Sequence, residues 1–351
     1  MQKQANTLFP GFDSLRLLGA LSVLFSHSYL ITQDTDASEP LQQLLKGEKN
    51  IAGLYGVFTF FIVSGFLLAR SLHRNPSPLR FTINRSLRLF PGFGICVLFC
   101  ALVVGPLSTS LPLQEYVLSA GWIRYIQESL TQIADAPLPG VFNYTSSIAQ
   151  VVNGSLWSLR AELICYVILL CCWLVLPAAG WVAALFAALG GTILMVPSVL
   201  NSLPEVAYPW PYFAAGVVMW WLTHHLGDSR TLAFFSIAGM GASLLLGFPH
   251  QAFACFGAYL VVYVGCRPTP LSTWIEQVGD LSYGLYLFGW PVQQMLRQFL
   301  DLRLPLVMFV ASTIITGCLA WLLFHTVEQP AMALRQPLVA WLSRSRSSRT
   351  G

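Results

Sequence analysis

Two basic motifs inside apolar sequence are the parts of this chain best suited to chemistry. In FDSLRLLGALSVLFSH, Arg16 precedes His27 by eleven positions. Eleven residues make about three turns of an α-helix, so both side chains lie on one face, roughly 16 Å apart. Ionisable groups cost roughly 2.5–3.5 kcal/mol each in a membrane, which favours a functional role, and a neutral imidazole can deprotonate an alcohol. The alternative is a structural histidine that bonds Ser26, Ser28 or a backbone carbonyl.

The second motif is a pair of arginines, Arg85 and Arg88, beside the third apolar run. Residues three apart share a helix face, so the two guanidinium groups together can clamp a phosphate. Paired arginines beside a span are also common as simple topology signals. Arg16 has two interpretations as well: it binds an anion, or it reaches the membrane surface next to Asp13.

Two further polar residues interrupt apolar runs. Ser64, in GVFTFFIVSGFLLAR, precedes a glycine that lets a ligand or another helix approach closely. Glu162, in GSLWSLRAELICY, has Ser158 and Tyr166 one turn away on either side of the same face. A carboxylate in a membrane needs a partner, and we expect Glu162 to contact His27 and orient its imidazole.

Two other patterns lie further along the chain. Tyr283, Tyr286 and Trp290 form a stripe on one helix face, which is typical of packing or of a membrane interface. Asp280 and Glu328 either shape the entrance of the site or are exposed.

The composition shows which elements must position these residues. Of 351 residues, 55% are hydrophobic and 10% charged, with a mean hydropathy of +0.63. These values indicate a polytopic membrane protein, and the net charge of +4 gives no sign of nucleic-acid binding. We predict an all-α bundle of about ten transmembrane helices. The predicted spans are 12–33, 53–72, 87–108, 156–176, 181–200, 208–225, 231–248, 251–266, 279–299 and 304–326.

The distribution of Lys and Arg predicts that both termini are cytoplasmic. Residues 1–333 are expected to form one transmembrane domain. Within it a long outer segment, about 109–155, is expected to cover the outer mouth of the bundle as a lid. Residues 334–351 form a basic cytoplasmic tail that we expect to be disordered and to lie near anionic lipid.

Six motifs, in order along most of the chain, resemble the acyltransferase 3 family of membrane O-acyltransferases. They are FDSLRLLGALSVLFSH, GVFTFFIVSGFLL, INRSLRLFP, GSLWSLRAELICY, LSYGLYLFGWPV and VEQP. The resemblance implies a bundle of helices that moves an acyl group, commonly acetyl, from cytoplasmic acyl-CoA to a glycan hydroxyl. One position departs from the pattern, because Gly289 stands where many relatives have histidine.

The resemblance also implies roles for particular residues. His27 is expected to be the general base or a transient acyl carrier, with Glu162 orienting the site. Arg16, Arg85 and Arg88 are expected to bind the donor. The roles of Glu162 and of Ser64, which we also expect to bind the donor, come from their positions in apolar helices and not from the resemblance. We expect acyl-CoA, by preference acetyl-CoA, as donor and no metal.

The expected partners are a glycan or lipid-linked saccharide acceptor and membrane lipid, and the expected location is a bacterial inner membrane. The alternative function is a multi-pass transporter or flippase of lipid-linked glycans, which would also need embedded Arg, His and Glu side chains. Such a protein would more typically show paired repeat halves, which this sequence lacks.

Overall fold

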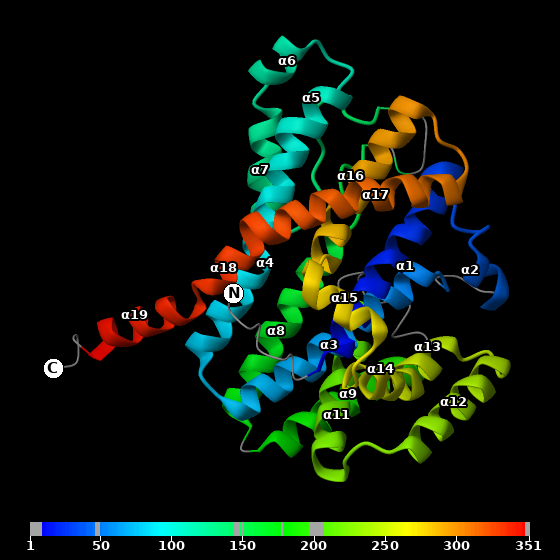
Figure 1. Cartoon of the computed structure of the whole chain (residues 1–351), viewed down its shortest axis with the longest axis vertical. Coiled ribbons are helices and arrows are strands. Elements are labelled where there is room, and N and C mark those ends of the chain that lie inside the picture. The colour runs from blue at the N-terminus through cyan, green and yellow to red at the C-terminus, as the bar shows by residue number, and fades with distance from the viewer. Residues whose placement is uncertain are drawn as a thin grey trace.

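The structure is a computed structural model of the whole chain (Figure 1). The described residues are 9–45, 50–143, 148, 150–176, 178–196 and 207–347, with side chains as far as residue 342. Within these ranges the chain is helical apart from its connections and one isolated bridge between Thr109 and Val141.

A helix lies at each of the ten segments predicted as spans. They are α1 (Gly11–Gln33), α3 (Ala52–Arg74), α4 (Pro78–Phe99) continued by η1 (Cys100–Val104) and α5 (Gly105–Ser108), α8 (Trp157–Val175), α9 (Ala179–Met195), α11 (Trp210–Leu226), α12 (Arg230–Leu245), α13 (Pro249–Ala252) continued by η3 (Phe253–Gly257) and α14 (Ala258–Gly265), α16 (Ser282–Leu300), and α17 (Pro305–Leu323) continued by η4 (Phe324–Glu328). Shorter helices are α2 (Pro40–Leu45) and α15 (Pro270–Val278).

Length and hydropathy show how many of these helices can cross a membrane. Among the described residues five helical segments qualify, and a sixth is added if the bent pair Pro249–Gly265 and Pro270–Val278 forms one span. Helices α9 and α12 are apolar but shorter. The structure thus confirms an all-α, multi-pass membrane protein, while ten spans and the orientation of the termini stay predictions.

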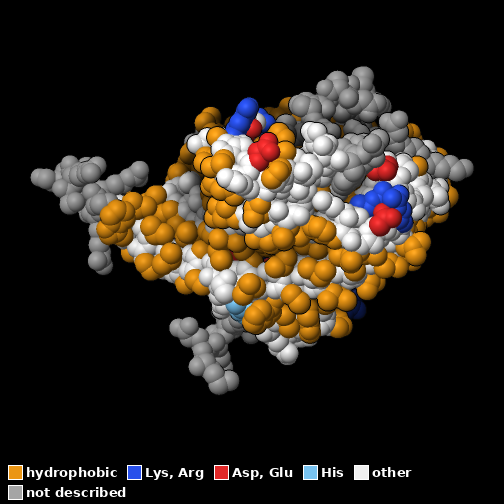
Figure 2. All heavy atoms as spheres, turned by 90° about the horizontal axis from the view of Figure 1, so that it is seen from above, with side chains coloured by type: hydrophobic (Ala, Val, Ile, Leu, Met, Phe, Trp, Pro, Cys, Tyr) orange, Lys and Arg blue, Asp and Glu red, His pale blue; other side chains and the backbone are white. Residues whose placement is uncertain are grey.

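The outer surface of the bundle is apolar, as a lipid-facing surface must be. On α17, Leu306, Val310 and Ile314 are each more than half exposed. In the view of Figure 2, hydrophobic side chains cover much of the face, whereas charged side chains gather in a few small groups.

Glycines bring the backbones of α1, α3 and α11 into direct contact. A Cβ atom added to Gly56 of α3 would lie 2.5 Å from the carbonyl oxygen of Gly19 in α1. One added to Gly65 of α3 would lie 2.2 Å from the carbonyl oxygen of Phe213 in α11. Because no larger side chain fits, these three helices form one closely packed unit. Helices α16 and α17 pack on α1 from elsewhere on its surface.

The 109–155 segment is folded and is attached to the bundle at its end. It contains α6 (Leu113–Leu118) and α7 (Gly121–Gln132), and α7 packs on α4 and η1. The Asp135 carboxylate accepts hydrogen bonds from the backbone N–H groups of Val152 (2.9 Å) and Asn153 (2.8 Å). The buried Asn153 side chain donates to the carbonyl oxygen of Leu287 in α16. This attachment fixes the last residues of the segment against α16.

The described part of the C-terminal tail, which was expected to be disordered, is helical, and residues 348–351 lie outside the described residues. Helix α18 (Gln329–Ala333) follows η4, and α19 (Arg335–Ser347) projects away from the bundle (Figure 1). The composition of the last residues led to the expectation of disorder. The stretch before them, RQPLVAWL, contains good helix formers, and α19 packs on α4.

Candidate active site

A partly open cavity of about 730 Å³ is lined by residues of α1, α3, α4, α8, α15 and α16 and by single residues of η4, α18 and α19. Five of the six side chains predicted from the sequence line it. They are Arg16, Ser64, Arg85, Arg88 and Glu162. His27, the sixth, lies outside the lining, although it shares the uninterrupted helix α1 with Arg16.

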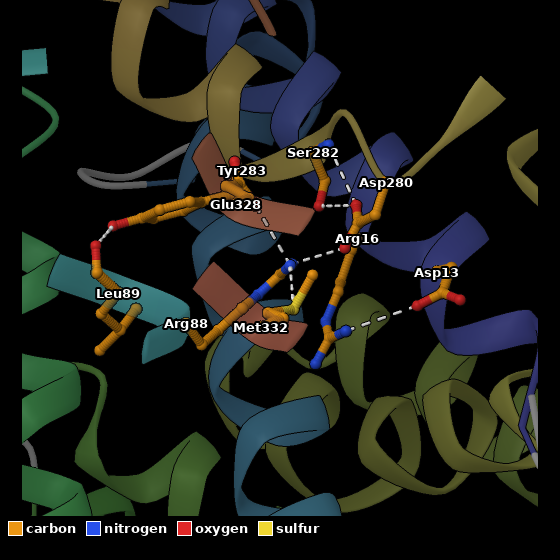
Figure 3. A network of polar contacts seen from close by, with 9 residues as sticks. All are labelled: Asp13, Arg16, Arg88, Leu89, Asp280, Ser282, Tyr283, Glu328 and Met332. Atoms are coloured by element: carbon orange, nitrogen blue, oxygen red, sulfur yellow. Dashed lines mark hydrogen bonds and ion pairs between the residues drawn. The ribbon is translucent and has the colours of Figure 1, made fainter. Parts of the chain in front are cut away.

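Arg88 is the centre of a buried ionic network (Figure 3). Its Nη2 lies 2.5 Å from Oδ2 of Asp280, and its Nη1 lies 3.2 Å from Oε2 of Glu328. The Asp280 carboxylate also accepts hydrogen bonds from the backbone N–H and the hydroxyl of Ser282. The network ties α4 to the start of α16 and to η4. Arg88 is therefore already neutralised by two carboxylates, which its motif did not predict.

The other predicted arginines are less engaged. In α1, Arg16 Nη1 lies 3.4 Å from Oδ1 of Asp13, a long ion pair (Figure 3). Arg85 has no ion pair with any residue that the structure describes, and its guanidinium carbon lies 6.0 Å from the centre of the Tyr166 ring. The cation that sequence reasoning missed is Arg335, which also lines the cavity. It was assigned to the tail, and its one sequence signal is its place about one turn after the VEQP motif.

Glu162 is bound by neutral hydroxyl groups. Ser64 Oγ donates to its Oε1 at 3.0 Å, and the hydroxyl of Tyr166 donates to the same oxygen. Ser158 and Tyr166 line the cavity together with Glu162, so the three share a face as predicted. The expected contact between Glu162 and His27 does not form, because its carboxylate is held by α3 instead.

His27 has a buried ring nitrogen that is not satisfied. Its ring meets Trp290 edge to face, with ring centres 4.8 Å apart. Nδ1 is buried without a hydrogen-bond partner among the described residues. The adjacent serines bond elsewhere, Ser26 to Glu39 and Ser28 to a backbone carbonyl. An unsatisfied buried nitrogen is costly and uncommon, which disagrees with a purely structural histidine.

The aromatic stripe of α16 links the cavity to this histidine. Tyr283 and Tyr286 line the cavity, and Trp290 lies one turn beyond Tyr286 against the imidazole. The Tyr286 hydroxyl lies 2.5 Å from the Ser158 hydroxyl and donates to a backbone carbonyl of the 109–155 segment, as does the Trp290 indole. The final residues of the segment thus bond Trp290, which contacts His27, and none of the segment's described residues lines the cavity.

The same stripe explains why the carboxylate and the imidazole are apart. Glu162 lies one turn from Ser158 along α8, and Ser158 is level with Tyr286. Trp290, which touches His27, lies one turn from Tyr286 along α16. Helix α16 runs parallel to α4, because Tyr283 bonds Leu89 and Leu287 meets Cys96. Helix α8 runs antiparallel to α4, because Tyr166 lies near Phe81 and Asn153 bonds Cys96. The two turns therefore run in opposite directions, which separates the carboxylate and the imidazole by about 12 Å, too far for a hydrogen bond.

A cavity lined by arginines inside a multi-pass helical bundle, with an unsatisfied imidazole on one of the helices that line it, defines the protein as a helical membrane protein with a buried polar site. Residues 9–325 match the family model described as an acyltransferase domain. The chain therefore belongs to the acyltransferase 3 family, as its motifs predicted, and this assignment favours an O-acyltransferase over a transporter.

Two curated proteins are similar over nearly the whole chain. The O-acetyl transferase of Shigella phage Sf6 is 25% identical over 345 residues, covering 92% of this chain and 98% of that protein. Nodulation protein 10 of Rhizobium leguminosarum bv. viciae is 29% identical over 370 residues, covering 94% and 95%. No solved structure matches the chain.

Proposed function

We propose that this acyltransferase moves an acyl group, by preference acetyl, from cytoplasmic acyl-CoA to a hydroxyl of an envelope or exported glycan or lipid-linked saccharide. The observation that carries the proposal is the juxtaposition of the arginine-lined cavity and the unsatisfied His27 in one bundle. The protein acts in a bacterial inner membrane, with both termini and the Arg16 end of α1 on the cytoplasmic side.

The arginines that line the cavity suit the phosphates of the donor. CoA carries several phosphate charges, and guanidinium groups bind phosphate through paired hydrogen bonds. Arg16 and Arg85 receive the phosphates, and Arg88, although paired with carboxylates, forms part of the same wall. Ser64 lies deeper, beside Glu162. The pantetheine arm then extends toward His27, over roughly the 16 Å that separate Arg16 and His27 along α1.

The reaction takes place at the imidazole. His27 accepts the proton of the acceptor hydroxyl while the oxygen attacks the thioester carbonyl. The carbon–sulfur bond breaks, and the CoA thiolate takes the proton back from the imidazolium. In a two-step version the imidazole itself carries the acyl group before the hydroxyl attacks; we favour the direct route. Glu162 orients the cavity wall through Ser64 and Tyr166 rather than by touching the imidazole.

The test is glycan mass analysis of cells that carry His27→Ala at the protein level of the unmodified chain. A general base contributes about 10²–10⁴ in rate, so acyl decoration should fall below detection. The matched control is His225→Ala, at the exposed end of α11, which should leave decoration intact. Unchanged decoration of every glycan in the His27→Ala cells would refute the proposal.

A further inference from the structure

The four arginines that line the cavity are not equally neutralised. Arg88 is matched by two carboxylates, and Arg16 by Asp13 at 3.4 Å. Arg85 and Arg335 have no ion pair among the residues whose side chains the structure describes. Asp13, Glu162, Glu276 and Asp280 also line the cavity, so its wall carries no net charge, but the guanidinium groups of Arg85 and Arg335 have no carboxylate at ion-pair distance in the described part of the chain.

Arg335 is placed as a ligand-binding group would be. It is the first residue of α19, which packs on α4, the helix that carries Arg85 and Arg88. Its Nε is buried without a hydrogen-bond partner in the described part of the chain. Its positive charge is also repelled by the positive charges of Arg85 and Arg88. A half-buried cluster of like charges is unfavourable on its own and becomes favourable when an anion binds between them.

We propose that Arg335 and Arg85 together form the phosphate-binding part of the donor site, with the C-terminal helix supplying one half of it. Two planar guanidinium groups facing one cavity can hold a phosphate in a two-sided clamp. Arg88, bound to Asp280 and Glu328, fixes α4 against the start of α16 and against η4. This inference rests on the proposed function, since it assigns the phosphates to the CoA part of the donor. It differs from the sequence motif by pairing Arg85 with a residue 250 positions away.

The experiment measures CoA binding to the purified full-length protein in lipid nanodiscs by calorimetry. Arg335→Ala should weaken binding by about tenfold or more, which corresponds to about 1.4 kcal/mol. The affinity of this variant should also depend less steeply on salt, because one phosphate contact has lost its charge. Arg335→Lys should restore part of the affinity, since lysine keeps the charge but not the fork. Arg303→Ala is the matched control, because Arg303 is exposed and pairs with Asp301 away from the cavity.

A second probe identifies the phosphate concerned. Dephospho-CoA lacks the 3′-phosphate, and if the clamp holds that group, wild-type protein should bind this probe about as weakly as Arg335→Ala binds CoA. If the clamp holds the diphosphate instead, the tenfold loss on Arg335→Ala should be the same for both probes. Either pattern supports the clamp.

The outcomes separate the inference from the proposed function. If the wild-type protein binds CoA and Arg335→Ala binds it equally well, the clamp is wrong and the proposed function stands. If the wild-type protein does not bind CoA, the donor assignment fails and the clamp fails with it. Arg335→Gln replaces the alanine variant if alanine lowers thermal stability, and equal affinity of the glutamine variant refutes the clamp in the same way.

Discussion

Removing the Arg88 side chain should destabilise the protein far more than removing an exposed arginine. Arg88→Ala leaves two carboxylates, Asp280 and Glu328, facing each other without their cation. The Glu328 side chain is 2% exposed and that of Asp280 15%, so water can replace the guanidinium only in part. Breaking a buried ion pair from one side costs about 3–5 kcal/mol, whereas an exposed pair is worth about 0–1 kcal/mol.

The assay is thermal unfolding in detergent. Its readout is the fraction of protein that stays monodisperse in size-exclusion chromatography after heating. Arg88→Ala should melt several degrees below both the wild-type protein and the control Arg303→Ala. A triple variant, Arg88→Met with Asp280→Asn and Glu328→Gln, removes all three charges and should recover most of the loss, because no unpaired charge remains. If Arg88→Ala melts with the control, or if the triple variant is the least stable, the network does not hold the three elements together.

Two further predictions concern the attachment of the 109–155 segment and the helix contacts. Burial raises the pKa of Asp135 to about 7, even though backbone N–H groups favour its ionised form. The pKa of an unfolded aspartate is near 3.9, so between about pH 4 and pH 7 the folded protein holds a proton that the unfolded chain has lost. The free energy of unfolding should therefore fall over this range, by on the order of 4 kcal/mol at most, and then level off. Asp135→Asn should flatten this dependence in melting curves recorded at pH 5 and pH 8; an unchanged slope would show that Asp135 does not titrate there. Gly65→Ala should lower the melting temperature, because overpacking costs about 1–3 kcal/mol and the new Cβ meets backbone. Gly94→Ala, where the added atom meets nothing within 4 Å, is its control and should not destabilise.

The helices could be predicted well because a membrane span is recognisable from the hydropathy of its own residues. Each predicted span has its helix, and Arg16 and His27 lie on one uninterrupted helix as their spacing required. The arginines, Ser64 and Glu162 gather around one cavity, since polar groups in apolar helices must face inward.

What the sequence did not predict depends on contacts between distant residues. Nothing near Arg88 in the sequence indicates its carboxylate partners, which follow it by 192 and 240 positions. Glu162 pairs with Ser64 instead of His27 because of how α8 is aligned along its length with α16, whose Trp290 contacts His27. Hydropathy does not fix how two neighbouring helices are aligned. Arg335 was overlooked because a basic residue near a terminus looks like a topology signal.

The glycine contacts among α1, α3 and α11 determine which wall of the cavity can move. Backbones in direct contact cannot slide past each other without a clash, so these three helices keep fixed positions relative to one another. Between α8 and α16 the contact is a bond between side chains, because the Tyr286 hydroxyl, which also donates to the carbonyl oxygen of Ser155, meets the Ser158 hydroxyl. A change of side-chain rotamer breaks that bond without moving a helix. Under the proposed function, the thioester passes to His27 along the face between α8 and α16, so the rate of this step should follow the motion of the Tyr286 side chain rather than a rearrangement of the bundle.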